Sequence, residues 1–187
     1  MTDGFKNIFF IDIETSGPKY FESVPLNVSI VPFDSSFSNF EAFIRYQDIC
    51  WAGRGREFFD DYRSEWERKA VSPERFCQGL NSYFQDVGVP EIILTGHNIS
   101  FDIHFLNRVY SDANANLPQE LSHRTIDTHT LLFLLAHLKK IPTDATSSDS
   151  AFNLFGLTAT DSDRHTATFD ALLTKKLFKR ILEIFEM

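Results

Sequence analysis

The chain has 187 residues, of which 43% are hydrophobic and 14% aromatic, and its formal net charge is -8. This length predicts one domain, residues 1–187, with enough apolar surface for a core, which excludes a disordered chain or one that needs disulfides. Two cysteines, Cys50 and Cys77, form neither a disulfide framework nor a zinc motif, so we expect a reducing, cytoplasmic setting.

Two classes of partner are disfavoured. No apolar run approaches the ~18–20 residues that cross a bilayer, so no membrane partner is expected. The sequence pI of about 5.2 argues against capture of nucleic acid by a basic face, although it allows a nucleic-acid enzyme that carries metal ions. The oligomeric state is left open.

The first half of the chain predicts three strands before any helix. Residues 5–14 are apolar and β-branched, and a turn signal at Thr15-Ser16-Gly17-Pro18 ends them. Residues 28–33 and 40–46 carry alternating apolar side chains on either side of a turn signal. These two segments are therefore predicted to extend the sheet in antiparallel fashion.

Helices and strands alternate in the remainder. Ser72 as N-cap and Pro73 at the first helical position begin one helix, and Gly88 ends it. Ser148 or Ser150 is predicted to cap a short helix that ends near Gly156. The other predicted elements are helix 60–69, strand 91–97, helix 100–110, short strand 124–127, helix 128–140 and final helix 166–185.

Two carboxylates share one face of the first predicted strand. Side chains of a strand alternate, so Asp12 and Glu14 lie opposite Ile11 and Ile13. Burying an unpaired carboxylate costs several kcal/mol, so the pair needs a cation, a proton or many hydrogen bonds. A divalent metal is the simplest answer. The alternative is a pair of carboxylates that caps the sheet edge toward solvent.

Two further segments carry acidic and histidine side chains. Asp102 falls in the first turn of a predicted helix, where the helix dipole favours an anion, although an acidic residue there is ordinary. His165 and Asp170 converge if His165 lies on the loop before the final helix and Asp170 on its inward side. A histidine with a pKa near about 6.5 is a natural general base, but a lone histidine is more often structural.

The three segments read Asp12-Ile13-Glu14-Thr15-Ser16-Gly17, His97-Asn98-Ile99-Ser100-Phe101-Asp102 and His165-Thr166-Ala167-Thr168-Phe169-Asp170. In this order they resemble the three motifs of the DnaQ-like DEDDh 3'→5' exonuclease family, D-x-E-T-[TS]-G, H-N-x-x-F-D and H-x-A-x-x-D. The resemblance implies an α/β ribonuclease H-like fold, a mixed five-stranded sheet flanked by helices. It also implies a base, His165, and ligands of two Mg²⁺ or Mn²⁺ ions: Asp12, Glu14, Asp102 and Asp170.

The implied reaction releases nucleoside 5'-monophosphates from single-stranded 3' ends, and DNA and RNA remain alternatives. A polymerase or another replication or repair protein is a possible partner. Two other functions stay open, a non-catalytic nucleic-acid-binding domain and a metal-dependent phosphatase of small nucleotides. The candidate substrate contacts are Ile13, Thr15, Asn98 and Phe101, with Arg54 and Arg56 as candidates for the substrate backbone.

Two parts of the chain depart from the family pattern. Many family members carry Glu or Gln in the region where this chain has Asn27, and the stretch 47–68 replaces their usual Gly-Ile-Thr signal. These departures put the subfamily in question and leave the five proposed catalytic residues in place. Asp127 precedes Thr128 in a pair that is common in the family, but we interpret it as a helix N-cap.

Overall fold

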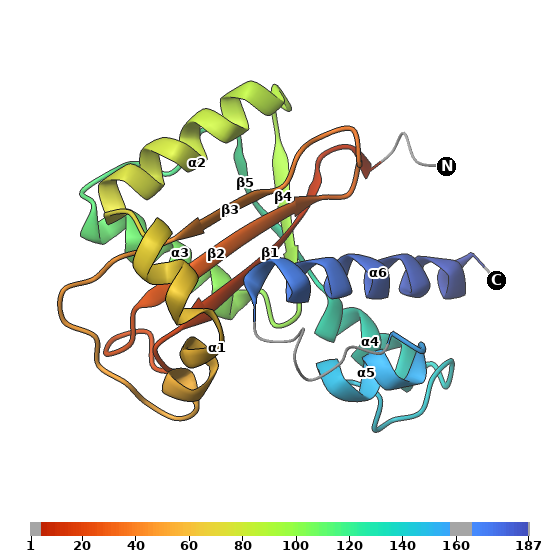
Figure 1. Cartoon of the computed structure of the whole chain (residues 1–187). Helices are drawn as coiled ribbons and strands as arrows, with labels where there is room; N and C mark the ends of the chain where they lie inside the picture. Colours follow the sequence, from red (N-terminus) through yellow and green to blue (C-terminus); the bar gives the residue numbers. More distant parts are fainter. Residues whose placement is uncertain (1–4, 158–165, 187) are drawn as a thin grey trace.

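A computed structural model describes residues 5–157 and 166–186, and its centre is a five-stranded sheet (Figure 1). The strand order is β3-β2-β1-β4-β5. β1 pairs antiparallel with β2 and parallel with β4, so the sheet is mixed, as predicted. The strands are β1 (Ile8–Thr15), β2 (Pro25–Pro32), β3 (Phe40–Phe43), β4 (Ile92–Gly96) and β5 (Leu121–Asp127).

Helices cover both faces of this sheet, which confirms the α/β class. In the described part of the chain no helix is long and apolar enough to span a membrane. The helices are α1 (Gly55–Lys69), α2 (Pro73–Val87), α3 (Ser100–Asp112), α4 (Thr128–His137), α5 (Ser148–Leu154) and α6 (Ala167–Phe185).

Several element boundaries differ from the sequence prediction: β2 begins at Pro25 and not at 28, β3 ends at Phe43 and not at 46, and β5 begins at Leu121 and not at 124. α1 begins five residues before the predicted start at 60, because Gly55 and Phe59 already pack inward with Tyr62. α4 ends at His137 and not at 140. The N-cap of α5 is Ser147, whose hydroxyl oxygen accepts the backbone N–H of Ser150 at 3.3 Å. The predicted caps, Ser148 and Ser150, were therefore wrong by one and three residues.

The alternation predicted for β1 is confirmed by the two cores on either side of it. Phe9, Ile11 and Ile13 join the core under α2 and α3. Ile8 and Phe10 face α6, which crosses the opposite side of the sheet (Figure 1). Since both faces of β1 are covered, the carboxylates that continue the α6 side can meet solvent only at the carboxyl end of the strand.

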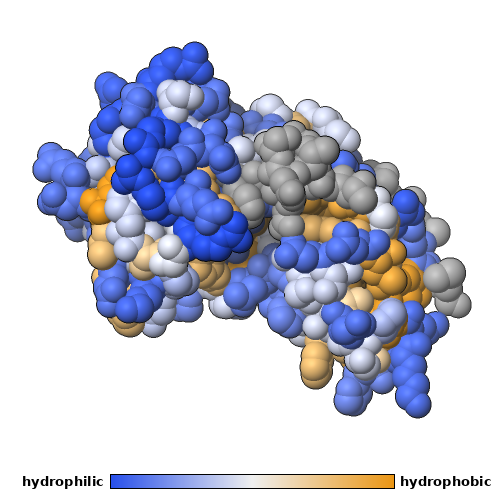
Figure 2. Space-filling view, turned by 60° about the horizontal axis from the view of Figure 1, so that its bottom comes forward, coloured by the Kyte–Doolittle hydropathy of each residue, from blue (hydrophilic) through white to orange (hydrophobic). Residues whose placement is uncertain are grey.

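A separate apolar cluster joins α4, α5 and α6. Figure 2 shows the end of the molecule at which α1, α4 and α5 lie; the surface on the α1 side is mostly hydrophilic, and hydrophobic side chains gather on the side of α4 and α5. The exposed members there include Phe133, Leu138 and Leu154.

The first turn of α6 is anchored by a polar side chain inside the sheet. The N-cap residue Thr166 makes no side-chain capping bond. Instead, the fully buried Asn27 of β2 accepts the backbone N–H of Ala167 at 3.1 Å through its Oδ1 and donates to the Ala42 carbonyl at 3.3 Å. Asn27, the residue that departs from the family pattern, therefore fixes the turn of α6 that carries Asp170.

We expect Asn27→Leu to lower the free energy of unfolding by about 1–3 kcal/mol, because the buried N–H of Ala167 loses its acceptor. Urea denaturation measures this change. Asn107→Ala is the matched control, since Asn107 is exposed and bonds only the Ile103 carbonyl of its own helix at 2.8 Å. Equal stability of the two variants would contradict the anchoring role.

Candidate active site

Three carboxylates meet at the carboxyl end of β1. Asp12, Glu14 and Asp170 each offer an oxygen, and these oxygens lie within 4.8 Å of one another. All three side chains are partly buried, two on neighbouring same-face positions of β1 and one in the first turn of α6. Carboxylate oxygens are the ligands that Mg²⁺ and Mn²⁺ prefer, so this donor set suits a divalent cation.

Asp102 adds a fourth carboxylate beside Glu14 but is not a member of that three-residue group. Its side chain is 5% exposed. Burial raises the pKa of Asp102 well above its ordinary value of 3.8; the backbone N–H groups of Asp102 and Ile13 oppose that rise, and the charge of Glu14 adds to it. Gly96 makes room, because a Cβ there would lie 2.8 Å from Ile99 and 3.4 Å from the Asp102 Oδ2.

His97 lies next to two of these carboxylates. It lines a cavity of about 130 Å³ together with Asp12 and Asp170. The Thr128 hydroxyl donates to the Gly96 carbonyl at 3.1 Å, so it accepts from the His97 Nδ1–H, also at 3.1 Å. Burial, and then the nearby His129, lower the pKa of His97, which favours a neutral ring with its lone pair on Nε2.

From the sequence, no role in the site was assigned to His97. The available signal was its place at the start of the second motif, directly after a buried strand. The predicted base His165 lies outside the described residues, so its role stays a prediction.

A second cavity, of about 270 Å³, adjoins Glu14. Its wall contains Ile13, Thr15 and Phe101, three of the four predicted substrate contacts. The Thr15 hydroxyl donates to the Gly17 carbonyl at 2.7 Å, so this side chain also shapes the turn after β1. The remaining wall comes from that turn and from the start of α1: Gly17, Pro18, Gly53, Arg54, Gly55 and Phe58.

Close backbone approach brings α1 to this cavity. A Cβ on Gly55 would collide with the backbone of Ser16, so only glycine lets the helix begin against the turn. Arg54 lines the cavity and pairs with Glu57 at 2.8 Å. Arg56 is not part of the wall and lies 3.6 Å from Asp60.

Asn98 lies elsewhere, on the exposed turn between β4 and α3. Its φ of 61° is left-handed, a conformation that asparagine tolerates better than most residues. Its backbone N–H donates to Asp127 Oδ1 at 2.9 Å, and the same oxygen accepts the N–H of His129 at 2.9 Å. The predicted N-cap role of Asp127 is confirmed, whereas a substrate contact by Asn98 stays a prediction.

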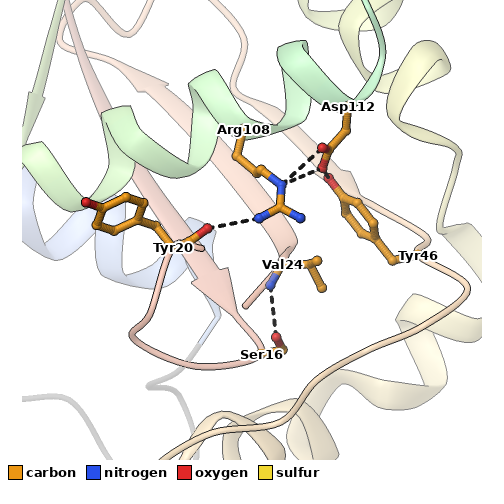
Figure 3. Close-up of polar contacts among 6 residues, drawn as sticks. All are labelled: Ser16, Tyr20, Val24, Tyr46, Arg108 and Asp112. Carbon is orange, nitrogen blue, oxygen red and sulfur yellow. Dashed lines mark hydrogen bonds and ion pairs between the residues drawn. The ribbon is translucent and has the colours of Figure 1, made fainter. Parts of the chain in front are cut away.

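The loop between β1 and β2 is bonded to α3 (Figure 3). Arg108 donates to the carbonyl of Tyr20, in the turn after β1, at 2.9 Å and to the Asp112 carboxylate at 2.9 Å. Tyr46 donates its hydroxyl to the same carboxylate at 3.1 Å, and burial followed by the charge of Asp112 raises the pKa of Tyr46. Arg108 therefore bonds the loop backbone, and Asp112, which also accepts from Tyr46, orients Arg108.

No family model and no curated protein matches this chain, but solved structures of exonuclease I do. A zinc-bound complex of the Escherichia coli enzyme with single-stranded DNA has a TM-score of 0.75 at 16% identity, over 96% of this chain and 42% of that one. The complex with a dT13 oligonucleotide gives the same values. The enzyme of Methylocaldum szegediense has a TM-score of 0.70 at 13% identity, over 95% and 41%.

At these identities the likeness shows the fold, which is the ribonuclease H-like fold of exonuclease I that the motifs predicted. The chain spans about 42% of the length of the Escherichia coli enzyme.

We expect Asp102→Asn to make the metal-free protein more stable at pH 7, by an amount of the order of 1 kcal/mol or about 2–4 °C. The raised pKa of Asp102 means that ionisation opposes folding, so the advantage shrinks as the pH falls toward 3.8. Thermal melts in EDTA and in Mn²⁺ measure both effects, because the variant should also lose most of the stabilisation by Mn²⁺.

Asp86→Asn, on an exposed position of α2, is the matched control and should change neither melt. An Asp102→Asn protein that is no more stable in EDTA would contradict the burial argument, and one that keeps the full response to Mn²⁺ would contradict a ligand role.

Proposed function

We propose that this protein is a metal-dependent 3'→5' exonuclease that removes nucleoside 5'-monophosphates from single-stranded DNA. One observation carries the proposal: three carboxylates have oxygens within 4.8 Å of one another, and one of them, Glu14, lines a cavity of about 270 Å³. This arrangement occurs in the fold of exonuclease I, which is described in complex with single-stranded DNA and with dT13. The DNA complexes of these neighbours favour DNA over RNA.

The negative charge of the carboxylates suits them to bind metal ions. Asp12, Glu14 and Asp170 would hold two divalent ions together with Asp102. Such ions, when bound, neutralise a phosphodiester, polarise its phosphorus and lower the pKa of water. Four carboxylates alone would repel the same phosphodiester, and four negative charges balance two dications.

The chain's own residues would orient the substrate. The cavity beside Glu14 would hold the terminal nucleoside, with Ile13 and Phe101 as apolar walls. The scissile phosphate would then lie at the carboxylates. His165 would take the proton of the attacking water, the role that its motif implies. His97, whose neutral ring lines the cavity with Asp12 and Asp170, would present Nε2 as an acceptor on that side.

The location and partners belong to the same proposal. Both Cys50 and Cys77 are free thiols, as a cytoplasmic setting requires. An exonuclease I structure is described with the C-terminus of a single-stranded DNA-binding protein, which supports a replication or repair partner of that kind. A polymerase partner, the other possibility, has no structural observation in its favour.

The test is hydrolysis of 5'-labelled single-stranded DNA and RNA oligonucleotides in Mg²⁺, Mn²⁺ or EDTA. We expect a metal-dependent ladder that shortens from the 3' end, faster on DNA. Asp12→Ala and Asp170→Ala should lower turnover by a factor of at least about 10³, since each removes a ligand. His165→Ala should slow turnover by about 10²–10⁴ while Mn²⁺ still stabilises the protein.

Asp86→Asn is the control for lost acidic charge and should retain full activity. Release of phosphate from nucleoside monophosphates without a ladder would establish the phosphatase alternative. Oligonucleotide binding without hydrolysis in any metal would establish the binding domain. Full activity of Asp12→Ala would falsify the site.

A further inference from the structure

Three aromatic rings form an exposed group beside the site. Tyr20 and Phe21 lie in the loop between β1 and β2, with ring centroids 4.1 Å apart, and Tyr20 stacks on His104 of α3 at 4.9 Å and 13°. Phe21 is 81% exposed and Tyr20 41%. We call Tyr20, Phe21 and His104 the aromatic step. A phenylalanine this exposed gains nothing from the core, so the fold itself does not explain it.

The step is held in position without being covered. The backbone of Tyr20 is fixed by Arg108, which Asp112 holds in turn (Figure 3). The Ser23 N–H also donates to the Lys19 carbonyl at 2.7 Å and closes the loop. The rings are therefore presented to solvent by a loop whose backbone is bonded to α3, which lowers the ordering cost of a ligand that stacks on them.

The step continues the wall of the 270 Å³ cavity. His104 follows Phe101 by three residues, so the two side chains lie one turn apart on the same side of α3. Phe101 and Pro18 belong to the cavity wall, and Pro18 precedes Tyr20 by two residues. The three rings therefore lie close to the cavity that would hold the end of a strand.

We propose that the aromatic step stacks the bases of the nucleotides that precede the 3'-terminal one. This inference rests on the proposed function and describes how the proposed active site binds the rest of the strand. Stacking on aromatic rings is tolerant of sequence, because every base has a flat face. In this proposal, the loop between β1 and β2 contributes much of the affinity of the protein for a single strand.

The charges around the step favour bases over phosphates as the groups that it binds. Lys19 pairs with Glu22 at 3.4 Å, and Arg108 pairs with Asp112 at 2.9 Å. The formal net charge of the whole chain is -8. Release of counterions, which drives binding of nucleic acids to basic grooves, therefore adds little to the free energy of binding here. Stacking on the rings is the interaction that this surface offers to a strand.

The experiment is a titration with a single-stranded DNA 12-mer that carries 2-aminopurine at the second position from its 3' end. An Asp12→Ala background in Mg²⁺ prevents hydrolysis during the measurement. Stacking quenches the fluorescence of 2-aminopurine, so binding should reduce the signal. Adding Phe21→Ala or Tyr20→Ala should weaken binding by about tenfold and remove most of the quenching.

Phe133→Ala is the matched control, because Phe133 is 60% exposed on α4, in a different part of the molecule, and its loss should leave the titration unchanged. Thermal melts of all variants should agree within about 2 °C, since the truncated rings are exposed. Absence of quenching, or quenching that survives both Tyr20→Ala and Phe21→Ala, would overturn the inference. That result would leave a protein partner as the ligand of these rings.

Steady-state kinetics in the otherwise unaltered protein separate this inference from the proposed function. Phe21→Ala should raise KM about tenfold for the 12-mer, whereas the p-nitrophenyl ester of thymidine 5'-monophosphate, which has no preceding base, should show no such rise. Equal rises on both substrates would overturn the inference. If the unaltered protein hydrolyses neither substrate, the proposed function fails, and the fluorescence titration still decides whether the step stacks bases.

Discussion

Crowding of negative charge at one end of β1 is the constraint on which the rest of the structure depends. Asp12, Glu14 and Asp170 come within 4.8 Å of one another, and Asp102 is buried beside them. Unneutralised carboxylates in such a place repel each other and lose hydration. The surrounding fold has to supply the free energy that keeps them together, and a cation would return much of it.

That free energy comes from packing on both faces of β1. Ile11 belongs to the core with α2 and α3, and Phe10 to the core with α6. The polar contact between Asn27 and the first turn of α6 then sets where α6 begins, and Gly96 lets Asp102 approach. The packing of the core and these contacts therefore hold each carboxylate in a fixed position.

The sequence predicted those parts of the site that depend on local rules. Alternation along β1 placed Asp12 and Glu14 correctly, and the N-cap of Asp127 follows from a bond to a residue two positions away. The wall formed by Phe58 and the position of His97 depend on contacts between segments far apart in the chain, which no periodicity encodes. The anchoring role of Asn27 could not be predicted, because its partner, Ala167, is 140 positions away.

The distance along the chain between the ligands also has a consequence for biosynthesis. Asp12 lies in the first strand and Asp170 in the helix that ends at Phe185, so a ribosome must release nearly all of the described residues before both are present. Until then a nascent chain holds only part of the donor set. If the protein is the nuclease that we propose, nascent chains and fragments that lack α6 carry no activity against the cell's own nucleic acids.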